Sequence, residues 1–205
     1  MHSLCAALVL IAPSVAAAQD ALPAGIWTNT EDAYFAEEEG RPKPVPILIE
    51  VGGDARWRFI DAFSLPQGEW QAGPIPGLER RDGGSGWQIA GSEIRPARAF
   101  TCWVSVRKFA SKPDGTLDWT FKSGLVTFDQ GGRVTIPGRG EAPDVSIRLR
   151  NVTWAKGSRN KPSLVLYVHK DDPERAESYS WASPDASLVG INLRWMQGSC
   201  TRTGD

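Results

Sequence analysis

The chain has 205 residues, of which 23 are Lys or Arg and 24 are Asp or Glu, so its formal net charge is −1. Nucleic-acid binding depends on clustered Lys and Arg that neutralise phosphates, and no such cluster occurs here. We therefore expect no nucleic-acid partner. The length suits one folded domain, since a domain has about 100–200 residues.

The first eighteen residues resemble a secretory signal peptide. Residues 5–15 are apolar apart from Pro13 and Ser14, and Ala16-Ala17-Ala18 follows as a small-residue cleavage site. Signal peptides combine an apolar run of about 7–15 residues with such a site. Because a spanning helix needs about 20 apolar residues, we expect no stable membrane insertion. The sequence predicts a leader over residues 1–18, a single β domain over residues 19–205, and a periplasmic or secreted location.

Two cysteines, Cys102 and Cys200, remain after the leader. In the oxidising environment of an exported protein, such a pair most simply forms a disulfide, and two buried free thiols are the alternative. We expect no metal site, because His169 is the only histidine after the leader and Cys-x-x-Cys spacing is absent. Dinucleotide and phosphate-loop patterns are also absent, so no cofactor is expected.

Residues 25–40 combine a strand-like opening with signals for a short helix. Thr28-x-x-Glu31 has the spacing of a capping box. Gly40 can adopt the left-handed conformation that ends a helix, and Pro42 prevents its continuation. The sequence therefore predicts a helix over about residues 31–39.

The stretch just before this helix, Gly25-Ile26-Trp27, resembles the G-x-W motif that opens calycin barrels, the group that includes lipocalins and avidin-like proteins. This resemblance implies that Trp27 closes one end of a β-barrel and packs beneath an Arg or Lys from a late strand. Arg194 is the candidate for that partner. A C-terminal cysteine tied back to a mid-chain strand, as Cys200 and Cys102 would be, is also similar to lipocalins.

Beyond residue 45 the chain alternates between apolar and polar residues over short stretches separated by Gly and Pro turns. This period of two is typical of half-buried antiparallel strands. The alternating stretches lie at about residues 46–51, 56–59, 100–106, 117–122, 145–150, 164–169 and 188–195. The predicted fold class is all-β, arranged as a calycin-like antiparallel barrel or as a β-sandwich.

Residues 61–95 are rich in Gly and Pro and are predicted to form a long irregular loop, which in compact domains is either functional or mobile. Trp70 and Trp87 lie in this loop. Their rings either cover the open end of the core or stack on a ligand such as a sugar.

Two arginine pairs could supply polarity to a ligand site. Arg148 and Arg150 point to one side of a predicted strand, and Arg56 and Arg58 do the same on another. A solvated sheet face is one interpretation. The other is a clamp for a carboxylate or phosphate, which suits the planar fork of arginine.

Catalytic chemistry has little support in the sequence. A Ser-His-Asp relay needs a base, and we expect His169 to be an exposed structural residue at a strand end.

We predict an exported protein that binds a small molecule or glycan in a β-framed cavity through Trp70, Trp87, Arg56, Arg58, Arg148 and Arg150. One alternative is a hydrolase or lyase of polysaccharides that uses Asp118 or Glu69 as acid or base. The other is an envelope structural or inhibitor protein that recognises another protein.

Overall fold

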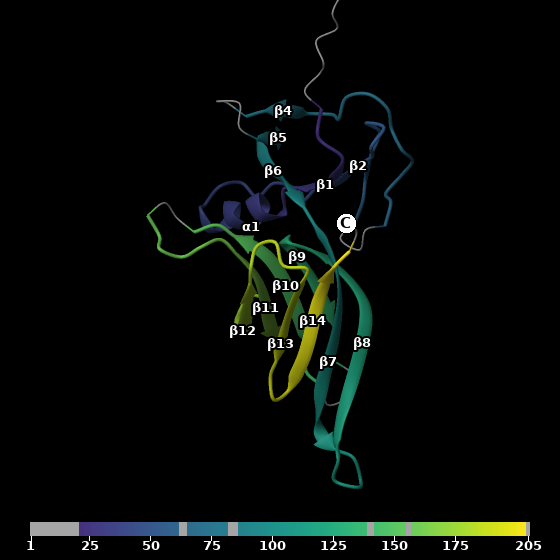
Figure 1. Cartoon of the computed structure of the whole chain (residues 1–205), viewed down its shortest axis with the longest axis vertical. Coiled ribbons are helices and arrows are strands. Elements are labelled where there is room, and N and C mark those ends of the chain that lie inside the picture. Colours follow the sequence, from purple (N-terminus) through teal and green to yellow (C-terminus); the bar gives the residue numbers. More distant parts are fainter. Residues whose placement is uncertain (1–20, 62–64, 82–85, 139–141, 155–156, 204–205) are drawn as a thin grey trace, which may run out of the picture.

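The computed structural model describes residues 21–61, 65–81, 86–138, 142–154 and 157–203, with the side chains of residues 37, 38 and 109–111 excepted. Within these ranges the chain forms fourteen β-strands and one helix, which confirms the all-β prediction (Figure 1). The predicted signal peptide lies outside the described residues. No helix in the described ranges is long and apolar enough to cross a membrane.

The N-terminal part is a six-stranded antiparallel sheet in the order β3-β2-β1-β6-β5-β4, curled into a half-barrel. Its strands are β1 (Gly25–Thr28), β2 (Leu48–Val51), β3 (Trp57–Phe59), β4 (Leu78–Arg80), β5 (Trp87–Ile89) and β6 (Ser92–Ala97). The apolar side chains of these strands alternate with polar ones and gather on one face, where Ile49, Trp57 and Ile94 are buried.

The prediction of one irregular loop over residues 61–95 is wrong in part. The stretch contains β4, β5 and the beginning of β6. Strands β4 and β5 have three residues each, and Gly and Pro surround them. Three residues are too few for an alternating pattern to stand out from its neighbours.

The predicted short helix is confirmed as α1 (Thr30–Glu38), between β1 and β2. At its start the backbone N–H of Thr30 donates to Oγ1 of Thr28. At its end Gly40 has φ of +68°, and the N–H of Arg41 donates to the carbonyl of Ala36, as in a Schellman motif. Glu31 does not close the expected capping box, because its carboxylate binds two arginines of another sheet.

The C-terminal part is an eight-stranded antiparallel meander divided into two sheets, in the orders β12-β11-β10-β9 and β13-β14-β7-β8. The last strand, β14, pairs with the first, β7. This part therefore has the strand order of an up-and-down barrel and the two facing sheets of a sandwich. Its strands are β7 (Ala99–Ser111), β8 (Leu117–Phe128), β9 (Gln130–Ile136), β10 (Val145–Val152), β11 (Ser163–Lys170), β12 (Ala176–Ala182), β13 (Leu188–Asn192) and β14 (Met196–Arg202).

The two sheets of the meander enclose a continuous hydrophobic core. Phe100 and Val104 from one sheet pack with Leu149 and Leu166 from the other, and all four are almost completely buried. The predicted disulfide is confirmed: Cys102 on β7 and Cys200 on β14 face each other across the ladder, with a Cα–Cα distance of 4.0 Å. The alternative of two free thiols is wrong.

Arg98 and Asp129 join the two parts. Strand β6 continues into β7 through Arg98, so one stretch of chain belongs to both the six-stranded sheet and the meander (Figure 1). The carboxylate of Asp129, which is 1% exposed, accepts hydrogen bonds from the backbone N–H of Arg98 (2.8 Å), from its Nε (2.6 Å) and from Nδ2 of Asn151 (2.6 Å). The corner where β8 turns into β9 is thereby fixed against the crossing strand.

The structure does not bring Trp27 and Arg194 together. Trp27 lies on β1 in the core of the six-stranded sheet, and its indole N–H donates to the carbonyl of Pro23. Arg194 is exposed in the turn between β13 and β14. This turn lies at the end of the two strands that points away from β1 (Figure 1). The calycin resemblance stays a prediction.

Candidate functional site

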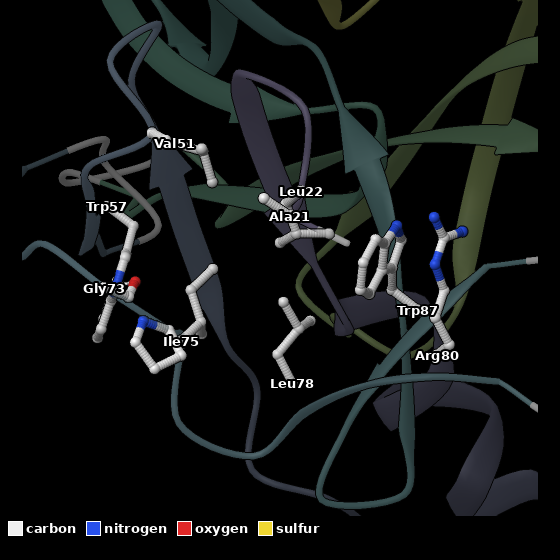
Figure 2. A pocket seen from close by; sticks show the side chains of 11 residues that line it. Ala21, Leu22, Val51, Trp57, Gly73, Ile75, Leu78, Arg80 and Trp87 are labelled. Carbon is white, nitrogen blue, oxygen red and sulfur yellow. Dashed lines mark hydrogen bonds between the residues drawn. The ribbon is translucent and has the colours of Figure 1, made fainter. Parts of the chain in front are cut away.

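A cavity of about 390 Å³ opens on the concave face of the six-stranded sheet (Figure 2). Residues of both edge strands, Trp57 on β3 and Leu78 on β4, line it, so the curl of the sheet creates the cavity. The lining is mainly apolar and consists of Ala21, Leu22, Val51, Ala55, Trp57, Gly73, Pro74, Ile75, Leu78, Arg80 and Trp87.

One wall is built by Trp57 and the segment that crosses it. The backbone of Trp57 exchanges two hydrogen bonds with Gln71, of 2.9 and 2.8 Å, and its indole N–H donates to the carbonyl of Gly73 (3.1 Å). These bonds hold residues 71–75 against β3, and Ile75 is buried beside Trp57. Because the polar indole atom is already satisfied, the ring presents apolar surface to the cavity.

The opposite wall is the hairpin of β4 and β5. Arg80 and Trp87 pair across this hairpin, and the guanidinium carbon of Arg80 lies 4.1 Å from the centroid of the Trp87 ring. Trp87 is buried, whereas Arg80 is exposed at the rim. Figure 2 shows the two side chains together, across the cavity from Trp57 and Ile75. The site thus combines aromatic walls with a cation at its edge.

Leu22, from the segment that precedes β1, also lines the cavity and is 4% exposed. The hydrogen bond from Trp27 to the carbonyl of Pro23, 2.9 Å long, fixes this segment against the sheet. Trp27 thus contributes to the cavity by holding Leu22 and its neighbours in place.

Of the six predicted ligand residues, only Trp87 lines the cavity. Arg58 stacks over the ring of Trp70 at 4.4 Å and forms an ion pair with Glu50. Arg58 and Trp57 are neighbours in β3, and successive side chains of a strand point to opposite faces, so the Trp70–Arg58 stack lies on the convex face of the sheet. Arg56 is exposed and pairs with Asp54 at 2.6 Å. The grouping of these residues in one pocket is wrong.

Arg148 and Arg150 share the carboxylate of Glu31 on α1. Nη2 of Arg148 lies 3.0 Å from Oε1, and Nη2 of Arg150 lies 2.8 Å from Oε2. Arg148 also donates to the carbonyl of Gly131 and stacks over the ring of Tyr34 at 3.8 Å. Burial lowers the pKa of the Arg148 guanidinium, and the Glu31 carboxylate opposes that change.

This network positions the helix and occupies both arginines. Gly131 is required beside it, because a Cβ there would lie 2.2 Å from Oε1 of Glu31 and the residue has φ of +81°. In the structure both arginines bind a carboxylate of the chain itself, 117 residues or more away in sequence, and their binding of an external anion stays a prediction.

The carboxylates considered for catalysis lie in different parts of the molecule. Asp118 is on β8 of the meander, where a hydrogen bond from Lys108 (2.5 Å) lowers the pKa of its carboxyl. Glu69 is exposed in the segment between β3 and β4. The two do not form the acid–base pair that glycoside hydrolysis uses.

His169 is buried, contrary to expectation, with 5% of its surface exposed. Burial and the nearby charges of Arg133 and Arg148 lower its pKa to about 4, so the ring is neutral at physiological pH. Within the described residues, no three His, Cys, Asp or Glu side chains gather in a way that could hold a metal ion.

Sequence reasoning missed most of the cavity. It did not identify Trp57, Leu22, Ile75, Leu78 or Arg80 as residues of a ligand site. The available signal was the pair of aliphatic residues Ile75 and Leu78 among the prolines and glycines of residues 73–78. Comparisons with protein-family models, with curated proteins and with solved structures gave no match.

Proposed function

We propose that this protein is an exported binding protein that holds a small, mainly apolar molecule in the cavity between Trp57 and Trp87. The cavity itself carries the proposal. Its volume of about 390 Å³ lies within the range of roughly 300–1,000 Å³ that ligand pockets have. Such pockets are lined mainly by apolar and aromatic side chains, with few polar groups, as this one is.

The lining favours a flat, ring-containing ligand. Trp57 and Trp87 face the cavity from opposite walls, and Leu22 and Leu78 add aliphatic surface between them. Arg80 at the rim favours a ligand with an acidic group at one end. A glycan has less support here, because the predominantly apolar lining offers few partners for several sugar hydroxyls.

Export remains part of this proposal. The disulfide between Cys102 and Cys200 is compatible with an oxidising compartment, and the first eighteen residues resemble a signal peptide. A carboxylate-based hydrolase has less support, since Asp118 and Glu69 lie far apart in the fold.

Two fluorescent naphthyl probes test the proposal. 1-Anilinonaphthalene-8-sulfonate is an aromatic anion, and N-phenyl-1-naphthylamine is its neutral counterpart. We expect saturable binding of both to the folded chain. Leu78→Trp fills the cavity and should weaken both by at least tenfold, or about 1.4 kcal/mol. Arg80→Gln should weaken only the sulfonate.

Leu188→Trp provides the matched control, because Leu188 is exposed on β13 and the same large ring enters there without touching the cavity. Its probe affinity should equal that of the unmodified chain. Absence of saturable binding, or equal binding by Leu78→Trp and Leu188→Trp, would show that the cavity is not a ligand site. Near-UV circular dichroism verifies that each variant is folded.

A further inference from the structure

On the outer face of the sheet β13-β14-β7-β8, three adjacent rows of cross-strand neighbours contain no charged residue. Arg107 lies in the next row, and Lys122 is exposed on β8 where its pairing with β7 shifts register. Cross-strand pairing defines the rows, and the residues between them, such as Cys102, Val104 and Cys200, face the core. The rows are Leu188-Thr201-Thr101-Val126, Gly190-Ser199-Trp103 and Asn192-Gln197-Ser105-Phe121. In a chain with 23% charged residues, an uncharged surface of this extent is unusual.

Two aromatic rings lie at the centre of this neutral face. Trp103 is 36% exposed and Phe121 is 60% exposed, and their rings stack with centroids 6.0 Å apart and planes 30° from parallel. Trp103 lies on β7 next to Cys102, whose disulfide ties β7 to β14, at a point where the pairing of β7 with β8 shifts register. Large aromatic side chains held at the surface of a strand are typical of binding surfaces rather than of cores.

A shallow groove of about 350 Å³ runs beside Trp103. Gly190 lines the groove and shares a row with Ser199 and Trp103, and a Cβ at Gly190 would lie 3.1 Å from Cβ of Ser199. The amides of Asn192 and Gln197 line the same groove. Each amide offers two N–H donors and a carbonyl acceptor, and the serine and threonine hydroxyls can donate or accept.

We propose that this neutral face binds an uncharged polysaccharide, with one sugar ring stacked on Trp103. The C–H face of a pyranose is apolar and flat enough to lie on an indole, while its hydroxyls need neutral donors and acceptors at the ring edge. Asn192, Gln197 and Ser199 supply these beside Trp103. This site is separate from the cavity and does not depend on its proposed function.

The charge of the face argues against other occupants. Nucleic acids need Lys and Arg to neutralise phosphates, and an anionic lipid surface needs the same. Protein interfaces are enriched in Arg as well as in aromatic residues, and the rows contain no arginine. A neutral polyhydroxylated chain fits both the aromatic centre and the amide-rich surround.

The opposite sheet supplies a matched control. Trp181 on β12 is 53% exposed, more than Trp103, but Tyr179 meets its ring edge-on at 88° with centroids 5.1 Å apart. Two perpendicular rings give no flat platform for a sugar. Trp181→Ala therefore removes an exposed indole of the same size from the same part of the fold without changing the proposed site.

Native gel electrophoresis in gels containing hydroxyethylcellulose, laminarin, galactomannan or dextran tests the proposal on the chain with its disulfide formed. We expect at least one of these neutral polymers to retard the protein, and the acidic polymer polygalacturonate not to. Trp103→Ala should weaken binding about tenfold, within the range that loss of one stacked ring causes. Trp181→Ala and the cavity-filling Leu78→Trp should leave it unchanged.

Asn192→Asp keeps the proposal testable if Trp103→Ala fails to fold. Asn192 is exposed at the end of β13, and the substitution adds one charge with almost no change in shape. It should weaken retardation severalfold. Three results would overturn the proposal. The first is that none of the four neutral polymers retards the protein, and the second is that polygalacturonate alone does. The third is that Trp181→Ala loses polymer binding while Trp103→Ala keeps it.

Discussion

The six-stranded sheet and the meander achieve burial in different ways. Strands of the meander have five to thirteen residues, and their apolar faces fill the space between two sheets. Strands of the six-stranded sheet have three to six residues, and much of their concave face borders a cavity. Long paired strands thus supply rigidity in one part, and short strands joined by loops leave room for a ligand in the other.

The two parts also differ in how they are fastened. A covalent bond joins the first and last strands of the meander. The six-stranded sheet is held by its own hydrophobic core and by non-covalent polar contacts, among them the bond between Trp57 and Gly73 and the attachment of α1 through Glu31. We therefore expect the six-stranded sheet to open at lower free energy than the meander.

The largest effect should follow from Glu31→Gln, which breaks one of the attachments between the parts, the ion pairs of α1 with Arg148 and Arg150. The substitution leaves Arg148, 5% exposed, without its counter-charge. Removing one partner of a buried ion pair costs about 3–5 kcal/mol. Urea unfolding should show this loss of stability, and the unfolding curve should separate into two transitions, one for each part. Glu93→Gln, which removes a more exposed carboxylate paired with Arg81 and Arg95, should cost under about 1 kcal/mol. Equal effects of the two substitutions would mean that Glu31 does not couple the parts.

The double substitution of Cys102 and Cys200 by Ala tests the fastening of the meander. Loss of the disulfide should lower the free energy of unfolding by about 2–4 kcal/mol, because the bond closes a loop of 98 residues in the unfolded chain. Thermal unfolding followed by circular dichroism measures it. Binding of the naphthyl probes below the transition should be unchanged. A variant that loses probe binding while its meander stays folded would contradict the separation of the two parts.

A smaller, pH-dependent effect should come from His169. Its folded-state pKa of about 4 lies below the ordinary value of 6.5, so the unfolded chain takes up the proton first as the pH falls. Stability should therefore decline between pH 6.5 and 4 by at most about 3 kcal/mol and lose nothing further from this group below that range. His169→Gln should remove this component from a series of urea transitions measured across the interval. An identical pH profile for both proteins would refute the assignment.

The sequence predicted those features that follow from a local residue pattern or from the number of cysteines. The disulfide followed from two remaining cysteines and α1 from Thr28 and Gly40. Alternation identified β7, β8, β10, β11 and β13, but it did not identify β9, β12 or β14. Burial of His169 could not be read locally, because it depends on strands and loops that are brought near it only by the fold.

The cavity and the contacts of Arg148 and Arg150 were less predictable from the sequence, because their residues are far apart in the chain and meet only in the folded structure. Arg148 and Arg150 were placed correctly on one side of a strand, but their partner Glu31 is more than a hundred residues away. The cavity requires β3 and β4 to approach each other from opposite edges of a curled sheet. Alternation within a strand gives no information on that curl.

The bond between Cys102 and Cys200 also determines how the molecule responds to a pull on its two ends. Tension that enters at the N-terminus passes from Cys102 directly to Cys200 through the two sulfur atoms, and residues 103–199 carry none of it. The six-stranded sheet lies wholly outside this shielded loop. Stretching would therefore extend the half-barrel and open its cavity while the strands between Cys102 and Cys200 kept their shape.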